Sequence, residues 1–187
     1  LHHMLLKEGY KAGMISTVGT KIVKKHTNTG LHVTTPSSQE IYQTLLLMQK
    51  RKCTHAVIEC TSQGLYMGRL AGLKFDVVVY TNITRDHLKY HKTWNNYALA
   101  KALLITQGLK PGGYVVLNKD DIRGYKFLTQ FTSKYISYTT SKNNTDAQTV
   151  SAYDIEETEN RISFKIEGKK YTVPVIGKYN VSNALAA

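Results

Sequence analysis

The feature that most constrains this chain is a regular alternation of strand-like and helix-like segments. Short apolar runs at residues 55–60, 75–80 and 113–118 are typical of strands. Between the last two lies a segment, 95–107, with apolar residues at helical intervals and Gly108 as its stop. Strands that alternate with helices require parallel crossovers, so the sequence predicts an α/β fold with a doubly wound, mostly parallel sheet. The runs at 55–60 and 75–80 do not alternate with polar residues, so we expect both of their faces to be covered.

The same kind of pattern extends over the rest of the first 140 residues. Ser37 and Glu40 have the spacing of a capping box, which marks the start of a helix. Ligands of a doubly wound sheet bind at the carboxyl ends of its strands, so we expect functional residues there. The further expected elements are a helix at 1–8, a buried strand at 12–16, a turn-rich segment at 17–30, a helix from Ser37 to about Lys52, a helix at 121–131 and a strand at 135–139.

The pattern changes after the polar stretch 141–149. Apolar and polar residues then alternate over 162–166 and again over 171–175, with a turn at Gly168. This alternation predicts an antiparallel hairpin or meander. We therefore divide the chain into three expected parts: an α/β core at 1–140, an antiparallel β segment at 150–176 and the start of a final helix at 177–187. The chain begins at Leu1 without a methionine and stops within a helical pattern, so we expect both ends to be cuts within a longer protein.

The net charge of +12 and the isoelectric point of about 9.6 raise the alternative of a nucleic-acid-binding module. Such a module needs a clustered basic face with interleaved aromatic residues. The cations cluster only at 24–25, 50–52 and 169–170, and the 13 tyrosines are distributed along the chain. An anionic small substrate fits the charge equally well, so we expect no nucleic-acid partner.

The cysteines and the hydropathy point to no further class. Cys53 and Cys60 match no zinc or redox spacing, and Cys60 ends an apolar run, where a small buried thiol is common. The chain shows neither an apolar run long enough to span a bilayer nor the pattern of a leader peptide. We therefore expect a soluble, cytoplasmic protein without a membrane partner.

Four sequence strings, in this order, resemble the Mur ligases. The similarity is best to the branch that adds the third peptide residue. The strings are Thr34-Thr35-Pro36; Glu59-Cys60-Thr61-Ser62-Gln63-Gly64-Leu65 with Arg69; Thr81-Asn82-Ile83-Thr84-Arg85-Asp86-His87-Leu88 with Tyr90-His91; and Gly177-Lys178-Tyr179-Asn180-Val181-Ser182-Asn183.

The resemblance implies a fold, a reaction and its reactants. It implies the P-loop NTPase-like central domain of an ATP-dependent ligase of peptidoglycan precursor synthesis. Such a ligase adds the third residue to UDP-N-acetylmuramoyl-L-alanyl-D-glutamate through an acyl phosphate. The implied cofactors are ATP and Mg²⁺, the co-substrate is meso-diaminopimelate or L-lysine, and we expect a monomer. The family's P-loop would precede Leu1, so we expect the chain alone to be inactive.

Another ligase of the same superfamily is the nearest alternative. A folylpolyglutamate synthase or a cyanophycin-synthetase-like enzyme shares the general pattern. The strings at 34–36 and 62–65 argue against both.

The resemblance implies three metal ligands: Glu59, His87 and a carbamylated Lys101. Magnesium prefers hard oxygen ligands, and Glu59 lies at the end of a buried strand-like run, where a surface or capped carboxylate is the alternative. Chemistry alone would make His87 a structural or acid–base histidine, with Asp86 orienting a neighbour. Burial of Lys101 would favour the neutral amine that carbamylation needs, whereas a solvated helix lysine is the alternative.

The resemblance also implies substrate and nucleotide contacts. Hydroxyls donate to carboxylate or phosphate oxygens, and a guanidinium holds a carboxylate by two bonds. Three positions depart from the family pattern and put the substrate contacts in doubt: Val33, Gln63 and Met67. Asn180 and Asn183 share a helix face and either bind adenine or cap the helix. The implied contacts are Thr34, Thr35, Ser62 and Arg69 for the muramoyl peptide, and Asn82, Asn180 and Asn183 for ATP.

Overall fold

The computed structural model describes residues 1–27, 34–84, 88–142 and 146–187. These residues form two compact units. Unit 1 comprises Leu1–Leu73 and Leu99–Leu103, and unit 2 comprises Lys74–Ala98 and Leu104–Ala187. The division of the chain into parts at 1–140, 150–176 and 177–187 remains a prediction.

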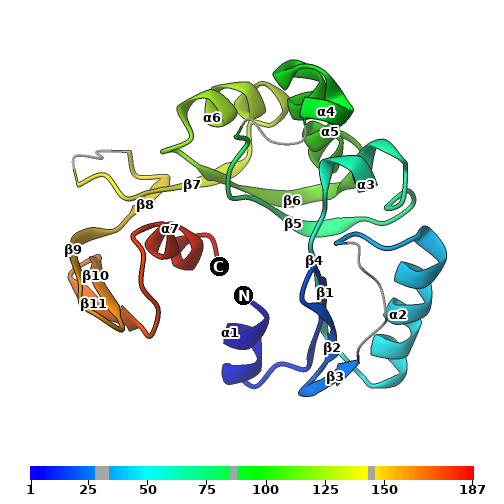
Figure 1. Cartoon of the computed structure of the whole chain (residues 1–187), viewed down its shortest axis with the longest axis horizontal. Helices are drawn as coiled ribbons and strands as arrows, with labels where there is room; N and C mark the ends of the chain where they lie inside the picture. Colours follow the sequence, from blue (N-terminus) through cyan, green and yellow to red (C-terminus); the bar gives the residue numbers. More distant parts are fainter. Residues whose placement is uncertain (28–33, 85–87, 143–145) are drawn as a thin grey trace. The chain divides into compact units, whose positions relative to one another are not determined.

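Unit 1 is built on a four-stranded sheet with the order β3-β2-β1-β4 (Figure 1). Strand β1 (Ala12–Ser16) pairs in parallel with β4 (His55–Ile58) and antiparallel with β2 (Gly19–Ile22), which pairs with β3 (Lys25–Thr27). The expectation of a merely turn-rich segment at 17–30 was therefore wrong in part. Both added strands are so short that their alternation gives little signal in the sequence.

Two helices flank the unit 1 sheet, one on each side (Figure 1). Helix α1 (His2–Lys7) reaches β1 through the His2 ring, whose Nε2 lies 3.2 Å from the carbonyl oxygen of Ala12. Helix α2 (Ser38–Lys50) begins with the predicted capping box, in which Ser37 and Glu40 exchange hydrogen bonds. Its Ile41 and Met48 side chains are buried. A short helix, α3 (Ser62–Tyr66), follows β4.

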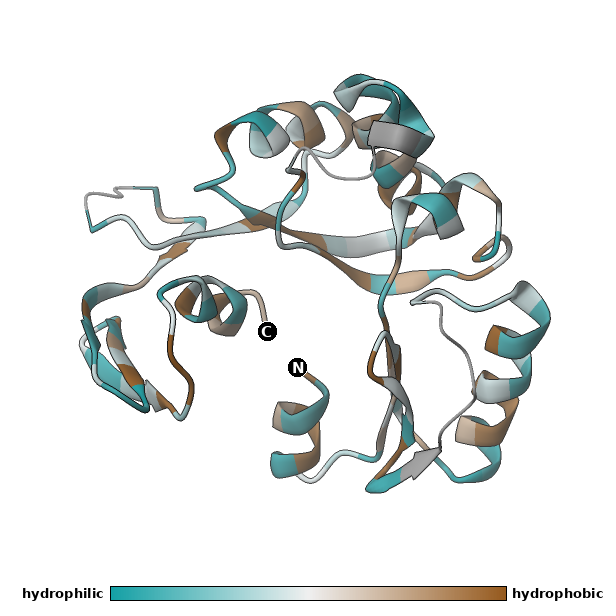
Figure 2. Cartoon of the chain, viewed as in Figure 1, coloured by the Kyte–Doolittle hydropathy of each residue, from teal (hydrophilic) through white to brown (hydrophobic). Residues whose placement is uncertain are grey.

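Unit 2 contains a four-stranded, all-parallel sheet with the order β5-β6-β7-β8. Hydrophobic stretches run along β5 and β6 in Figure 2. The strand expected at 113–118 begins earlier, at Leu109, and β8 was not predicted. The strands are β5 (Phe75–Tyr80), β6 (Leu109–Asn118), β7 (Tyr135–Thr139) and β8 (Thr149–Ser151).

The connections from β5 to β6 and from β6 to β7 contain helices, as the alternation predicted. The helix expected at 95–107 forms as α5, which belongs to both units, followed by a π-helical segment that ends at Gly108. The helix expected at 121–131 forms as α6 and a 3-10 turn. The helices are α4 (Leu88–His91), α5 (Trp94–Leu103), the π-helix Leu104–Gly108, α6 (Ile122–Leu128) and the 3-10 helix Thr129–Phe131.

Strands β4 and β5 are not covered on both faces by the described residues, contrary to expectation. In β5, Val78 and Tyr80 are buried, whereas Val77 on the opposite face is 51% exposed. In β4, His55 and Ala56 are exposed. An apolar run reports which side chains a strand carries, whereas coverage depends on the elements that pack on each face.

The C-terminal part confirms the predicted antiparallel segment. Strands β9 (Tyr153–Glu157), β10 (Ile162–Ile166) and β11 (Lys169–Val173) form a separate sheet, with Gly168 at φ +78° in the turn. Helix α7 (Tyr179–Leu185) packs on it through the fully buried Val181. The fold class predicted from the sequence is thus confirmed. No helix among the described ranges has the length and apolar character needed to cross a membrane.

Candidate active site

The carboxyl ends of β1 and β4 bring Glu59 and Thr17 together. The two strands are parallel, so the residues that follow them meet at one edge of the sheet. The main-chain N–H of Thr17 donates to Glu59 Oε2 at 2.9 Å. The Thr17 hydroxyl lies 3.0 and 3.1 Å from the two carboxylate oxygens. Sequence analysis identified Glu59 but missed Thr17, although its place after a strand was a usable signal.

The two predicted substrate threonines have different surroundings. The Thr34 hydroxyl lies 2.9 Å from that of Thr17, at the same edge as Glu59. The Thr35 side chain is buried, and its hydroxyl donates to the carbonyl oxygen of Glu59 at 3.0 Å. It also accepts from the N–H of Thr61 at 2.9 Å and from the Thr61 hydroxyl at 3.0 Å. A substrate contact from the Thr35 hydroxyl would have to replace one of these bonds.

Ser62 and Arg69 join the same edge through helix α3. Ser62 begins this helix and is buried. The Arg69 Nη1 donates to the carbonyl oxygen of Thr35 at 2.8 Å, which leaves other guanidinium hydrogens for further partners. A Cβ on Gly64 would lie 2.7 Å from Thr35 Cγ2, so glycine permits the helix to approach this closely. The four predicted substrate residues therefore gather around Glu59.

Lys101 also reaches this edge, from helix α5. Its Nζ donates to the carbonyl oxygen of Cys60 at 3.2 Å, one residue from Glu59. The side chain is half-buried and its neighbours Ala100 and Ala102 are buried. Burial also raises the pKa of the Cys60 thiol to about 12, which fits the interpretation of this cysteine as structural.

The described residues at the carboxyl ends of β1 and β4 provide some, but not all, of the ligands that a divalent cation needs. The Glu59 carboxylate is exposed and its Thr17 partners are neutral donors, so lone pairs and negative charge remain available. An unmodified Lys101 ammonium would repel a cation, whereas a carbamate would add a second carboxylate. Within the described ranges no three His, Cys, Asp or Glu side chains form a metal-binding group. The predicted ligand His87 and its neighbour Asp86 lie outside the described residues.

In unit 2, Asn118 links the end of β5 to helix α7. Its Nδ2 donates to the carbonyl oxygen of Thr81 at 2.7 Å and lies 3.4 Å from both Asn82 Oδ1 and Ser182 Oγ. Asn82, predicted to bind ATP, is exposed and sits beside this bridge. Sequence analysis did not single out Asn118, although it ends a predicted strand.

The two predicted adenine contacts of α7 form a pair. Asn183 Nδ2 donates to Asn180 Oδ1 at 3.2 Å, and Asn180 Nδ2 donates to the carbonyl oxygen of Ile176 at 2.7 Å. The N-cap of the helix is Lys178, which makes no side-chain capping bond. Neither asparagine therefore caps this helix, and the adenine contact remains a prediction.

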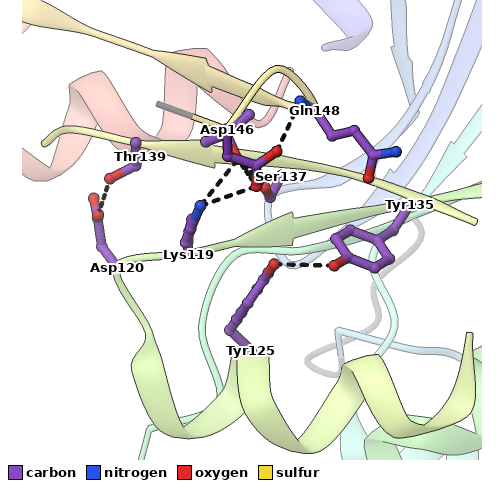
Figure 3. Close-up of polar contacts among 9 residues, drawn as sticks. Lys119, Asp120, Tyr125, Tyr135, Ser137, Thr139, Asp146 and Gln148 are labelled. Carbon is purple, nitrogen blue, oxygen red and sulfur yellow. Dashed lines mark hydrogen bonds and ion pairs between the residues drawn. The ribbon is translucent and has the colours of Figure 1, made fainter. Parts of the chain in front are cut away.

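A second polar cluster, which the sequence did not suggest, lies around β7 and β8 of unit 2 (Figure 3). Lys119 Nζ contacts Asp146 Oδ2 at 3.0 Å and Thr149 Oγ1 at 3.3 Å. The buried Ser137 hydroxyl lies 2.6 Å from that of Thr149. The Asp120 carboxylate binds Thr139 and the N–H and hydroxyl of Thr140. The bonds of Lys119 and Ser137 to Thr149 tie the short strand β8 to the rest of the sheet.

The whole chain, residues 1–187, matches the family described as the Mur ligase middle domain, and the protein belongs to that family. It is 34% identical over 185 residues to a UDP-N-acetylmuramoyl-L-alanyl-D-glutamate--2,6-diaminopimelate ligase of Clostridium botulinum, covering 98% of this chain and 37% of the relative. The chain thus spans little more than a third of that relative's length.

Solved structures agree with this family. The structure of a UDP-N-acetylmuramoyl-L-alanyl-D-glutamate--2,6-diaminopimelate ligase is similar with a TM-score of 0.82 and 28% identity, covering 100% of this chain and 38% of that one. The MurF ligase from Thermotoga maritima in complex with ADP has a TM-score of 0.62 at 15% identity, covering 99% of this chain and 39% of that one. The second likeness shows a shared fold alone.

Proposed function

We propose that this chain is the nucleotide-handling middle part of a ligase that extends UDP-N-acetylmuramoyl-L-alanyl-D-glutamate by a diamino acid, using ATP. The main observation in support is that five polar side chains lie near the carboxyl ends of β1 and β4: Thr34, Glu59, Ser62, Arg69 and Lys101. A relative that covers nearly the whole chain at 34% identity bears the name of such a ligase, which supports the substrate class.

The residues of this edge have two tasks in the proposed reaction. The reaction converts a substrate carboxylate into an acyl phosphate, so it must bind an anion and neutralise phosphoryl charge. Arg69 and Thr34 orient the muramoyl peptide, while Glu59, a carbamylated Lys101 and His87 hold Mg²⁺. The bound metal supplies charge neutralisation to the transferring phosphoryl group.

The nucleotide contacts come from unit 2. Asn82 follows β5, and Asn180 and Asn183 lie in α7. Amide side chains offer both donors and acceptors, which suits the edge of an adenine ring. In the proposal these three residues bind ATP.

A ligation assay on a ligase that contains this chain tests the proposal. We expect product and ADP in equal amounts from ATP, the muramoyl dipeptide and either meso-diaminopimelate or L-lysine. The variant Glu59→Gln should lose activity, because it removes the metal-binding charge. The matched control is Glu159→Gln, the same change at an exposed turn residue, which should keep it.

The outcomes separate the proposal from its nearest alternative. Turnover with a folyl substrate and glutamate, but none with the muramoyl dipeptide, would assign the chain to a folylpolyglutamate synthase. Equal activity of Glu59→Gln and the control would remove Glu59 from the site.

A further inference from the structure

We infer that Thr17 is a positioning residue that fixes the carboxylate of Glu59 in the orientation needed to bind the metal. This inference rests on the proposed function in one respect, the role of Glu59 as a metal ligand. Thr17 lies in the segment at 17–30, for which the sequence predicted only turns.

Thr17 contacts Glu59 through two separate donors. The main-chain N–H reaches Oε2 at 2.9 Å, and the hydroxyl reaches Oε1 and Oε2 at 3.0 and 3.1 Å. One residue thus contacts both oxygens and restricts rotation of the carboxylate. Glutamate has a long side chain with much rotamer freedom, so an exposed Glu59 would otherwise lose entropy when it bound a cation. Preorientation removes part of that loss.

The neighbouring hydroxyl of Thr34 completes the arrangement. Thr17 has a single hydroxyl hydrogen, and an ionised carboxylate accepts but cannot donate. When that hydrogen points to Glu59, the Thr34 hydroxyl, 2.9 Å away, supplies the hydrogen of the bond between the two threonines. Thr34 then holds Thr17 in the rotamer that serves Glu59.

The ends of two strands fix the position of Thr17. Thr17 follows β1 and Glu59 follows β4, and the parallel pairing Ile15↔Ile58 sets the distance between them. The side chain of Thr17 is exposed. Replacing its hydroxyl should therefore change the site without a large effect on folding.

The test measures Mn²⁺ affinity of the purified chain by electron paramagnetic resonance, with Mn²⁺ in place of Mg²⁺. We expect Thr17→Val to raise the dissociation constant about tenfold, since partners that orient metal ligands have effects of this size. Thr17→Ser keeps the hydroxyl and should restore most of the affinity. Thr54→Val, the same change at an exposed residue just before β4, is the matched control and should bind like the wild type.

A second readout needs no metal. In NMR spectra, the amide proton of residue 17 should lie downfield of its position in Glu59→Gln, because in the wild type it donates to the charged Glu59 carboxylate. Thr17→Val should keep this downfield position. An unchanged position of this amide proton in Glu59→Gln would contradict the contact on which the inference depends.

The outcomes distinguish this inference from the proposed function. If Glu59→Gln binds Mn²⁺ like the wild type, the metal role of Glu59 fails and the inference fails with it. If Glu59→Gln weakens binding while Thr17→Val leaves it unchanged, the metal role stands and the positioning role of Thr17 is overturned. Equal unfolding temperatures of Thr17→Val and the wild type would show that any loss of affinity is not a loss of fold.

Discussion

Glu59 in unit 1 and Asp146 in unit 2 are carboxylates in polar clusters of similar size, but their partners differ in charge. Asp146 accepts from the N–H of Gln148 and the Thr149 hydroxyl and forms an ion pair with Lys119 at 3.0 Å. Glu59 accepts from the neutral donors of Thr17, and no ion pair to it is found among the described residues. The charge of Asp146 is balanced by Lys119, whereas the described partners of the Glu59 carboxylate are neutral donors.

The two clusters are expected to have different tasks. The Glu59 cluster, which contains Thr17 and Thr34, should serve binding and catalysis and contribute little to stability. The Asp146 cluster, which contains Lys119, Ser137 and Thr149, should serve stability alone. The burial of Ser137 supports the second part, because its polar side chain is withdrawn from water. Substitutions in each cluster test this contrast.

The largest effect is expected for Lys101→Ala in a ligase that contains this chain. Loss of the proposed carbamate should lower the ligation rate by about 100-fold or more, because phosphoryl charge is then poorly neutralised. Excess formate or acetate should recover part of the rate by occupying the vacated position. The control is Lys126→Ala on helix α6, which should turn over normally. Near-normal turnover of Lys101→Ala would make this lysine a solvated helix residue.

Arg69→Ala should affect substrate binding more than nucleotide binding. The guanidinium donates to the carbonyl oxygen of Thr35, and the muramoyl peptide is proposed to bind at this edge of the sheet. We expect the KM for the muramoyl dipeptide to rise about tenfold or more, since a charge-assisted contact is lost, while the KM for ATP stays nearly constant. Steady-state kinetics with each substrate varied in turn measures both. Equal increases would remove Arg69 from the peptide site.

Ser137→Ala should change stability and leave ligation unaffected. The Ser137 side chain is fully buried and its hydroxyl lies 2.6 Å from that of Thr149. Loss of this buried hydrogen bond should lower the free energy of unfolding by about 1 kcal/mol. Urea denaturation measures the change. Ser133→Ala, at an exposed position, is the control and should stay within about 0.5 kcal/mol of the wild type.

The smallest effect is expected for Asp146→Asn and should depend on pH. The N–H of Gln148, followed by the side chains of Lys119 and Thr149, lowers the pKa of Asp146 below its ordinary value of 3.8. A lowered pKa in the folded state adds stability above the ordinary pKa, and this stability is lost as the pH falls through the lowered value. The unfolding temperature of the variant should therefore lie below that of the wild type at pH 7, and the two should converge below pH 3.8. An equal difference at both pH values would contradict the role of the ionised carboxylate.

Sequence reasoning predicted the regular elements well and the contacts between them poorly. The capping box of α2 and the stop at Gly108 follow from local chemistry, which neighbouring residues supply. The strands β2, β3 and β8 were missed because three to four residues give too short a pattern. Coverage of β5 was predicted wrongly because packing partners far along the chain decide it.

For the candidate site, too, the sequence pointed to individual residues but not to the contacts between them. The resemblance to the Mur ligases pointed to Glu59 and Lys101 as site residues. The structure brings Lys101 Nζ to 3.2 Å from the carbonyl oxygen of Cys60, which is 41 residues away in the chain. Thr17 stood in no recognised string, so its contact with Glu59 had no sequence signal beyond its place after a strand. The metal and substrate roles of these residues remain predictions.

Sequence patterns were enough to predict the alternation of the longer strands and helices, the antiparallel segment near the C-terminus and the family, since periodicity and short motifs are local properties. The hydrogen bonds between hydroxyls and carboxylates that lie far apart in the chain could be identified only in the folded structure. Thr17 and Glu59 are 42 residues apart and meet because β1 and β4 pair in parallel. The Thr35 hydroxyl was expected to bind a substrate, yet its hydrogen and acceptor positions are used by Glu59 and Thr61. A hydroxyl has one hydrogen to give, and the folded chain decides where it goes.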